Sequence, residues 1–241
     1  CACLVGSEMC IRDRNDISFE IADGEFLAIA GHTGSGKSTL VLHLNGVINP
    51  TRGKVLWDGQ DLADKKTANE ARGDIGVVFQ YPENQLFAAT VYEDVAFGPR
   101  NLGLDATEVE QRVKDAIELV ELDYETFKDR SPFELSGGQQ RRVAFAGVLA
   151  MRPTTLVLDE PVAGLDPASR NEFLGFIDRL HKRGITLVMV SHNMNDIARL
   201  ADRVLVLDRG EIAFLGTPEE VFSHPVELRE IGLGVPHAQR M

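Results

Sequence analysis

The sequence predicts an α/β fold in which a parallel β-sheet carries an inserted helical subdomain. Three observations lead to this prediction. Short apolar runs typical of buried strands lie at 26–30, 75–79 and 156–158, and predicted helices alternate with them. Glycine-rich or polar segments follow these runs directly. An amphipathic helical stretch lies in the long interval between the second and third runs.

The first predicted strand leads into a glycine-rich turn and a helix. In FLAIAGHTGSGKSTLVLHLNG, the helix is expected from about Gly36 to Leu44, where Asn45-Gly46 ends it. The turn matches the P-loop pattern G-x-x-x-x-G-K-[ST], in which backbone N–H groups and a helix N-terminus hold phosphate oxygens. The alternative, a chance match in a glycine-rich chain, is disfavoured by the strand and helix around it. The predicted nucleotide-binding residues of this P-loop NTPase core are Gly31, His32, Thr33, Gly34, Ser35, Gly36, Lys37, Ser38 and Thr39.

The strand predicted at 156–158 ends in two acids, Asp159 and Glu160. Carboxylates at a strand end suit a Mg²⁺ site, with Asp159 and the Ser38 hydroxyl toward the ion and Glu160 as general base for the attacking water. Successive side chains of a strand point to opposite faces, so we expect the two acids to serve different purposes. The alternative, a solvated strand end, is the weaker interpretation once the P-loop is considered.

A third motif, LSGGQQRR at 135–142, separates this chain from other P-loop proteins. Ser136 is expected to cap a helix, but capping alone does not explain the two glycines and the glutamine that follow it. With the P-loop and the two acids, the motif resembles the signature of ATP-binding cassette ATPases. The resemblance implies an antiparallel β subdomain beside the parallel sheet. It also implies a second cassette ATPase, a paralogue or the chain itself, because each ATP site would be completed across a dimer by Ser136, Gly137, Gly138 and Gln139.

The same resemblance assigns roles to three further residues. Gln80 matches the glutamine that touches Mg²⁺ or water and moves with the transport subunit. Asp166 matches a loop that crosses the dimer interface, although Asp166-Pro167 is also a plain start for a helix to about Lys182. His192 follows an apolar strand and matches the histidine that contacts the γ-phosphate. A purely structural role is the alternative for each, and the common order of all the motifs favours function.

The inserted helical subdomain is expected over about 82–151, within one cassette domain at 15–241. Lys37 and Ser136 are 99 residues apart, which leaves room for it. Its clearest helix is predicted in the stretch LDATEVEQRVKDAIELVEL, opened by the capping pair Asp105 and Glu108. The apolar positions expected on one face of this helix are Ala106, Val109, Val113, Ile117 and Val120.

Composition and charge limit the classes of partner. The chain carries 37 acidic and 25 basic residues, and this formal net charge of −12 disfavours a protein that mainly binds nucleic acid. No apolar stretch approaches the roughly 18 residues that a membrane-spanning helix needs. All three cysteines lie in the first ten residues, so neither disulfides nor thiolate metal sites are expected further along.

Local stretches resemble the ATPases of energy-coupling factor importers, which take up vitamins or transition metals. They are PENQLFAATVYEDVAFGPRNLGL, RRVAFAGVLAMRPTTLVLDEP, LADRVLVLDRGEI and LREIGLGVP. SPFELSGGQ and LREIGLGVP favour the second of two ATPase paralogues. The resemblance implies a Mg²⁺-dependent ATPase, peripheral on the cytoplasmic face of the cell membrane. Its partners would be a membrane coupling protein and a substrate-binding membrane protein.

The resemblance also suggests a docking groove for the coupling protein in residues 81–99. The residues expected there are Glu83, Phe87, Tyr92, Glu93, Asp94 and Phe97. Packing of this stretch on its own core is the alternative. The alternative functions are a soluble cassette ATPase acting on DNA or ribosomes, and the ATPase of another transporter class. Such soluble proteins commonly add a coiled coil, a zinc hook or a second cassette, and this sequence contains none of them.

The first 14 residues depart from the family pattern. VGSEMCIRDR at 5–14 matches the translation of a sequencing-library transposon end, so residues 1–14 are expected to be foreign to the protein. The family's first strand and its adenine-stacking aromatic residue would then be missing, and the chain is expected to be truncated at both ends. Because a base–aromatic stack contributes roughly 1–3 kcal/mol, we expect weaker ATP binding than in an intact relative.

Overall fold

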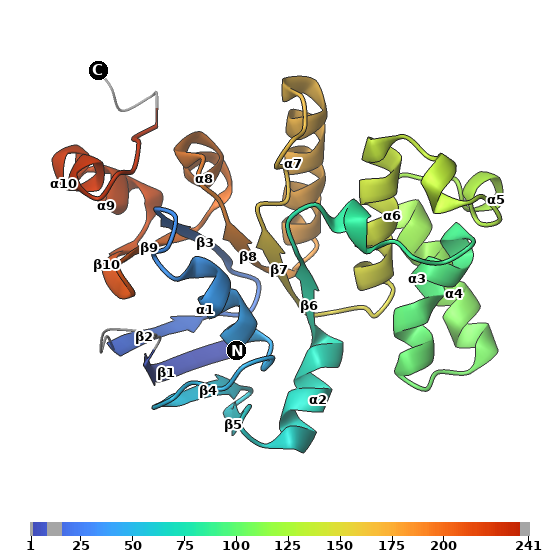
Figure 1. The fold of residues 1–241 in the computed structure, drawn as a ribbon, viewed down its shortest axis with the longest axis horizontal. Helices are drawn as coiled ribbons and strands as arrows, with labels where there is room; N and C mark the ends of the chain where they lie inside the picture. Colours follow the sequence, from blue (N-terminus) through green and yellow to red (C-terminus); the bar gives the residue numbers. More distant parts are fainter. Residues whose placement is uncertain (1, 9–15, 237–241) are drawn as a thin grey trace.

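A computed structural model describes residues 2–8 and 16–236 of the protein. The molecule has a sheet core at one end and a helical lobe at the other (Figure 1). The expected boundaries hold closely: the first predicted strand is β3, Phe26–Gly31, and the helix after it is α1, Lys37–Leu44. The other two predicted strands are β6, Ile75–Val78, and β7, Thr155–Asp159.

A six-stranded sheet forms the centre of the core, in the order β10-β9-β3-β8-β7-β6. Its remaining strands are β8, Thr186–Val190, β9, Arg203–Asp208, and β10, Glu211–Gly216. Five strands run parallel, and β10 pairs antiparallel with β9 at the edge. The predicted parallel sheet is therefore confirmed.

Strand β3 is apolar throughout because both of its faces are covered. All six of its residues are buried. Leu27 and Ile29 pack into the cluster that contains the apolar side of α1, whereas Ala28 and Ala30 pack into the cluster on the opposite face. A continuous apolar run, and not an alternating one, is the pattern that parallel strands buried on both faces require.

The remaining helices of the core cover the sheet. They are α2, Lys65–Asp74, α7, Pro167–Lys182, α8, Met194–Leu200, α9, Pro218–Phe222, and α10, Pro225–Glu230. Helix α7 begins where predicted, because the Asp166 carboxylate accepts hydrogen bonds from the backbone N–H groups of Ala168 and Ser169. Asp166 therefore does cap this helix, and capping is compatible with an additional role in a partner contact.

A four-stranded antiparallel sheet packs beside the core, in the order β2-β1-β4-β5. Its strands are β1, Ala2–Glu8, β2, Asp16–Ile21, β4, Lys54–Trp57, and β5, Gln60–Asp61. The expectation that the first strand is missing was wrong for the backbone, since β1 pairs with both β2 and β4. Backbone groups form this ladder, so the pairing does not depend on which side chains the segment carries. Residues 9–14 of the expected foreign segment lie outside the described residues.

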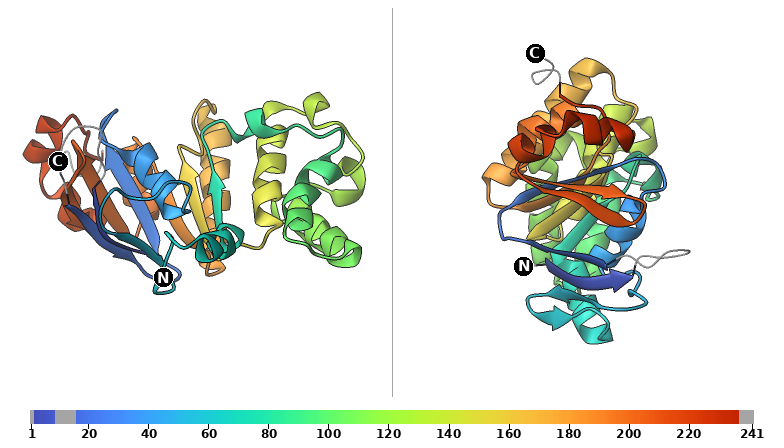
Figure 2. Two further views of the ribbon diagram at one scale, coloured as in Figure 1. Left: turned by 60° about the horizontal axis from the view of Figure 1, so that its bottom comes forward. Right: turned by 90° about the vertical axis from the view of Figure 1, so that its left-hand side faces the viewer.

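The helical lobe contains α3, Val91–Asn101, α4, Ala106–Leu119, α5, Tyr124–Phe127, and α6, Gly137–Leu149. Two short 3₁₀ helices, η1 at Pro82–Gln85 and η2 at Pro132–Glu134, connect it. The left view of Figure 2 shows the lobe set apart from the sheets, with α6 on the side of the lobe that faces the sheets. Phe145 of α6 packs edge-to-face on Phe173 of α7 at 4.8 Å between ring centroids, which joins the lobe to the core.

Helix α4 is capped and buried almost as predicted. Asp105 accepts from the N–H groups of Thr107 and Glu108. The side chain of Glu108, which we expected to share in the capping, contacts Arg112 and Arg152 instead. The prediction for Ala106 was wrong: it is exposed, because it is the first residue of the helix, whereas the other four predicted positions are buried.

Among the described residues, no helix is long and apolar enough to cross a membrane.

Candidate functional site

The predicted site residues of the core meet at the carboxyl edge of the parallel sheet. They line one cavity of about 790 Å³, together with Val190 and residues 232–234. The predicted residues in its wall are Gly31, His32, Thr33, Gly34, Gly36, Lys37, Ser38, Thr39, Gln80, Asp159, Glu160 and His192. Ser35 is buried behind this wall.

The P-loop is held in shape by its own polar contacts. Lys37 Nζ donates to the carbonyl oxygens of Gly31 and His32 at 2.7 and 2.8 Å. The His32 ring contacts Asp208 at the end of β9, with 3.0 Å between Nε2 and Oδ1. The Gly210 N–H donates to the Ser35 carbonyl at 3.2 Å. These contacts hold the loop against the core while its outer side faces the cavity.

Glycine is required at two P-loop positions for different reasons. A Cβ on Gly31 would lie 2.4 Å from Ser35 Oγ and 2.5 Å from the Leu207 carbonyl oxygen, so no side chain fits there. Gly36, the N-cap of α1, has a φ of 104°, which disfavours other residues. No side chain caps this helix, so its first N–H groups are free to bind an anion.

The two acids enter the same cavity, which differs from the expectation for neighbours on a strand. Strand β7 ends at Asp159, and Glu160 has a left-handed φ of 48°. Its N–H donates to the Val190 carbonyl at 3.0 Å, which fixes this turn. The alternation of strand faces therefore stops at Asp159, and both carboxylates face the phosphate-binding loop.

Glu160 is paired with His192. The Glu160 Oε1 and the His192 Nδ1 are 2.8 Å apart, and the histidine side chain is 76% exposed while that of Glu160 is 15% exposed. The carboxylate is therefore sheltered, and the imidazole reaches outward from it. Asn193 caps α8 through its own side chain, so this helix does not need His192 as a cap.

Burial and charge shift the pKa values of two groups in the site. Burial lowers the pKa of Lys37, and the charges of Glu160 and Asp159 oppose this shift. Burial raises the pKa of Asp159, the charge of Glu160 adds to the effect, and Lys37 opposes it. Burial therefore disfavours the charged forms of both Lys37 and Asp159, and such shifted pKa values are common at functional sites.

The signature residues and Asp166 lie away from this cavity. Ser136, Gly137 and Gly138 are exposed at the start of α6 in the helical lobe. Ser136 and Gln139 form a reciprocal capping box, so capping accounts for the glutamine, contrary to our expectation. The glycines are not explained by capping, since a Cβ on either would meet open space. Within one chain, the structure does not bring these residues to the P-loop.

Sequence reasoning missed the segment Gly232-Leu233-Gly234, which forms part of the cavity wall. It follows α10 in a Schellman turn, in which the N–H of Leu233 donates to the Leu228 carbonyl at 2.8 Å and that of Gly232 to Arg229 at 3.0 Å. The stretch LREIGLGVP was noted only as a family feature. Nothing in its spacing relates it to the P-loop, because the two meet only in the folded chain.

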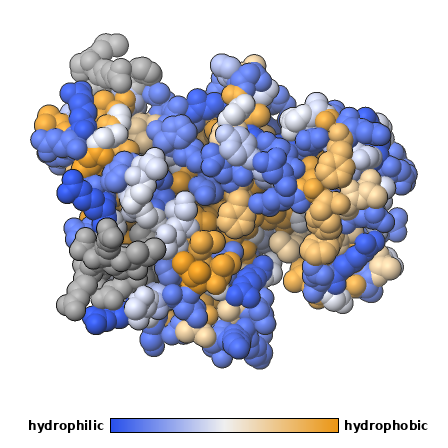
Figure 3. Space-filling model, in the orientation of Figure 1, coloured by the Kyte–Doolittle hydropathy of each residue, from blue (hydrophilic) through white to orange (hydrophobic). Residues whose placement is uncertain are grey.

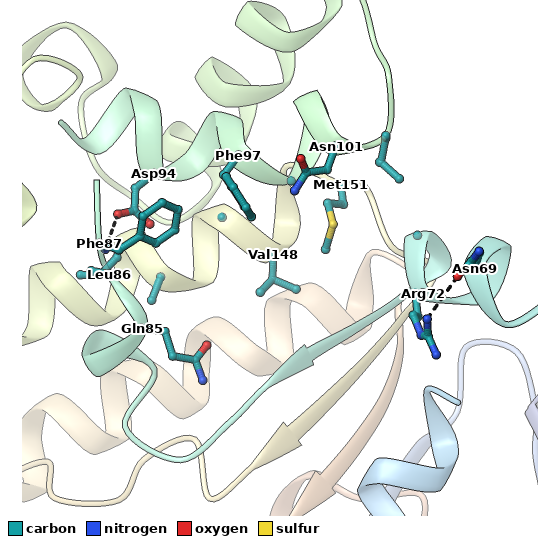
Figure 4. A pocket seen from close by; sticks show the side chains of 15 residues that line it. Asn69, Arg72, Gln85, Leu86, Phe87, Asp94, Phe97, Asn101, Val148 and Met151 are labelled. Carbon is teal, nitrogen blue, oxygen red and sulfur yellow. Dashed lines mark hydrogen bonds between the residues drawn. The ribbon is translucent and has the colours of Figure 1, made fainter. Parts of the chain in front are cut away.

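A second hollow, of about 370 Å³, lies between the helical lobe and the core. Apolar side chains flank it in the space-filling view (Figure 3). Phe87 and Phe97 pack edge-to-face at its rim and are 60% and 50% exposed (Figure 4). Asp94 accepts from the N–H groups of Phe87 and Ala88, and so holds the rim in place.

Three of the six residues expected in the docking groove do not line this hollow. Tyr92 packs against the core cluster, Glu93 is exposed elsewhere, and Glu83 is bound to Arg141. The hollow also receives residues from α2 and α6 that the sequence did not associate with it. They include Asn69 and Arg72 of α2 and Val148 of α6, and Met151 just after α6 also lines the hollow.

Comparison with known proteins decides the family. The family described as ABC transporter matches residues 14–163. The chain belongs to the ABC transporter family. It is therefore an ABC ATPase, as the motifs predicted.

Within this family the chain is similar to proteins called energy-coupling factor transporter ATP-binding protein EcfA2. The protein of that name from Symbiobacterium thermophilum is 59% identical over 225 residues, which are 93% of this chain and 78% of that protein. The one from Clostridium perfringens is 55% identical over 92% of this chain and 79% of its own length. The expected resemblance to the second paralogue is confirmed.

Two solved structures share the fold. That of cbiO1 from Clostridium perfringens, part of the ABC transporter complex cbiONQ, has a TM-score of 0.83 at 37% identity and covers 95% of this chain and 93% of its own. A dimeric, post-hydrolysis structure of the ATP-binding cassette MJ0796 with ADP and Pi has a TM-score of 0.76 at 29% identity, over 90% and 98% of the two chains. The predicted cassette fold is confirmed.

Replacing Glu160 with Gln should slow ATP hydrolysis by about 10²- to 10⁴-fold and leave ATP binding intact. The amide keeps the size of the side chain but cannot accept a proton from water. Steady-state turnover and nucleotide titration measure the two effects, with the exposed Glu110→Gln as control. Unchanged turnover would remove Glu160 as the general base.

Asp159→Asn should abolish hydrolysis and yet raise the melting temperature of the nucleotide-free protein at pH 7.5. The raised pKa of Asp159 means that its ionised form costs stability in the fold, and Asn removes this charge. The gain should shrink as the pH falls from the folded-state pKa towards the unfolded value of about 3.9, below which both states are protonated. Thermal melts at pH 7.5 and 4.5, beside the exposed Asp129→Asn, test this. A gain of equal size at both pH values would contradict it.

Proposed function

We propose that this chain hydrolyses ATP to power uptake of a vitamin or transition metal through an energy-coupling factor importer. The observation that carries the proposal is the single cavity that gathers the P-loop, Gln80, both acids and His192. The similarity to EcfA2 proteins supports the importer class.

The chemistry proposed for the cavity follows from its side chains. The N–H groups of the P-loop and the Lys37 ammonium bind the β- and γ-phosphates. Glu160 takes the proton from the attacking water, and His192, hydrogen-bonded to it at 2.8 Å, contacts the γ-phosphate. Because Glu160 is sheltered and His192 is exposed, the pair can hold water on its inner side and phosphate on its outer side.

The residues present fit a Mg²⁺ ion. Among the described residues, no group of three or more His, Cys, Asp and Glu side chains could hold a metal alone. Ser38, Gln80 and Asp159 instead offer three oxygen donors in one cavity. Mg²⁺ is commonly held in this way, by one or two carboxylates together with substrate phosphates and water. When bound, the ion would neutralise phosphate charge, and the raised pKa of Asp159 would fall beside it.

The second ATPase chain, a paralogue or a further copy, would close the site. The signature residues are exposed and distant from the chain's own P-loop, as residues that act on another chain's nucleotide must be. Asp166 is exposed at the start of α7, where it can contribute to the same contact. The dimeric MJ0796 cassette with ADP and Pi supports such an arrangement for this fold.

The hollow beside Phe87 and Phe97 is the proposed docking site for the membrane coupling protein. Two exposed aromatic rings at the mouth of an apolar hollow are typical anchors for a partner helix. Docking there would keep the chain peripheral, on the cytoplasmic face of the membrane. A substrate-binding membrane protein would complete the importer without touching the ATP site.

ATPase activity should rise more steeply than in proportion to protein concentration until dimers saturate. The site needs two chains, so dilution removes active sites. A mixture of Lys37→Ala with Ser136→Arg should recover activity that neither variant has alone, because a mixed dimer contains one intact pairing. Strict proportionality at low concentration, together with no recovery on mixing, would contradict self-pairing.

Phe87→Glu should prevent co-purification with the coupling protein of the same importer and leave ATP affinity within about twofold, since the substitution places a charge in the apolar hollow and not in the ATP site. Val226→Glu, at a side chain that is 59% exposed on α10, is the matched control. Retained co-purification of the Phe87 variant would remove this hollow as the docking site.

A further inference from the structure

Arg141 is a buried charge that the proposed reaction does not use. It lies in α6, one turn after the signature residues, and is 2% exposed. A charge so deeply buried destabilises a fold unless every part of it is hydrogen-bonded. Its partners therefore indicate what the residue is for.

One side of the guanidinium holds Glu83 in η1. Arg141 Nε donates to Glu83 Oε2 at 3.0 Å, and Nη2 donates to Oε1 at 2.8 Å. This is a two-bond pairing, which fixes orientation as well as distance. Burial acts to raise the pKa of Glu83, but the bonds and charge of Arg141 hold it below its ordinary value.

The other side of the guanidinium holds the backbone that follows Glu160. Nη1 donates to the carbonyl of Pro161 at 3.3 Å and to that of Ala163 at 3.0 Å, and Nη2 also donates to Ala163 at 3.0 Å. The same turn is closed by the Ala163 N–H, which donates to the Glu160 carbonyl at 3.0 Å. Two hydrogen bonds, both through Ala163, therefore connect Arg141 to Glu160, the proposed general base.

These contacts join three functional segments through one rigid group. Helix α6 carries the signature, η1 begins two residues after Gln80, and the 161–163 turn lies between Glu160 and Asp166. Helix η1 ends at Gln85, which lines the docking hollow together with Phe87. Because a guanidinium is planar and its donors are fixed relative to one another, displacing η1 changes the geometry offered to Pro161 and Ala163.

We propose that Arg141 is a positioning residue that links the docking hollow to the ATP site by holding η1 and the turn after Glu160 in one arrangement. The part that concerns the hollow rests on the proposed function. Arg141 does not line the ATP cavity, and it acts through the backbone that follows Glu160, which does line it. It should therefore affect turnover and the response of the hollow to ATP, and leave ATP affinity unchanged.

Arg141→Lys tests the link, because lysine keeps the charge but replaces the planar fork with a single ammonium. We expect kcat to fall about tenfold with KM for ATP within about twofold, since a small misplacement of a catalytic group costs turnover more than binding. Arg112→Lys is the matched control: this arginine is also mostly buried, and it joins Glu108 to the Met151 carbonyl, away from the ATP site. Its kcat should be unchanged.

A second variant guards against simple unfolding. Glu83→Gln keeps the shape of the partner and removes its charge, and it should lower kcat in the same way. Melting temperatures are measured for all three variants. If Arg141→Lys and Arg112→Lys lose similar stability and have equal kcat, or if both Arg141→Lys and Glu83→Gln turn over normally, the proposal is overturned.

Amide hydrogen exchange separates this proposal from the proposed function. In the Glu160→Gln background, MgATP should slow exchange in the P-loop and also in residues 84–88, and adding Arg141→Lys should abolish only the second effect. Equal protection of residues 84–88 with and without Arg141→Lys overturns the proposed role of Arg141 and does not affect the assignment of the ATP site. Absence of protection in the P-loop itself contradicts the proposed function, and the link falls with it.

Discussion

The register of the parallel sheet is the constraint on which the whole site depends. Asp159 of β7 pairs with Val190 of β8, and Val190 pairs with Ile29 of β3. The segments that follow these strands therefore start at the same height, and Glu160, His192 and the P-loop emerge side by side. On the other side, Val78 of β6 pairs with Leu158, which brings Gln80 to the same edge. Ordinary backbone hydrogen bonds between apolar strands thus assemble a charged site from residues up to 161 positions apart.

The site is built at a cost to the stability of the empty protein. Glu160 sits in a left-handed conformation, Asp159 is half-buried beside a like charge, and Lys37 is partly desolvated. Such features persist only where the surrounding structure enforces them. Here the Val190 carbonyl holds Glu160, and the P-loop carbonyls hold Lys37. A bound nucleotide with its metal ion would offset the charges of Lys37 and Asp159, so binding would stabilise the folded protein.

The two lobes divide the work of the molecule. The sheet core presents phosphate-binding and water-activating groups, whereas the helical lobe presents the signature and one wall of the hollow. They are packed together through aromatic contacts between α6 and α7 and through the hydrogen bonds from the buried Arg141 to the carbonyls of Pro161 and Ala163. Hydrogen bonds in a buried boundary resist relative movement of the two lobes more than apolar packing alone does. Any such movement leaves a buried donor or acceptor without its partner.

The sequence alone determined the central strands β3, β6 and β7, the P-loop, the acids and the order of the motifs, because these depend on local patterns. Apolar runs, capping residues such as Asp105 and Asp166, and fixed spacings within a loop are all readable along the chain. Only the tertiary structure decided that Glu160 turns into the same cavity as Asp159, that Gly232–Gly234 forms its far wall, and that Glu83 faces Arg141 and not a partner. Each of these depends on which distant segment occupies the neighbouring space. Local sequence patterns do not specify which distant segments pack together, because those contacts form only in the folded chain.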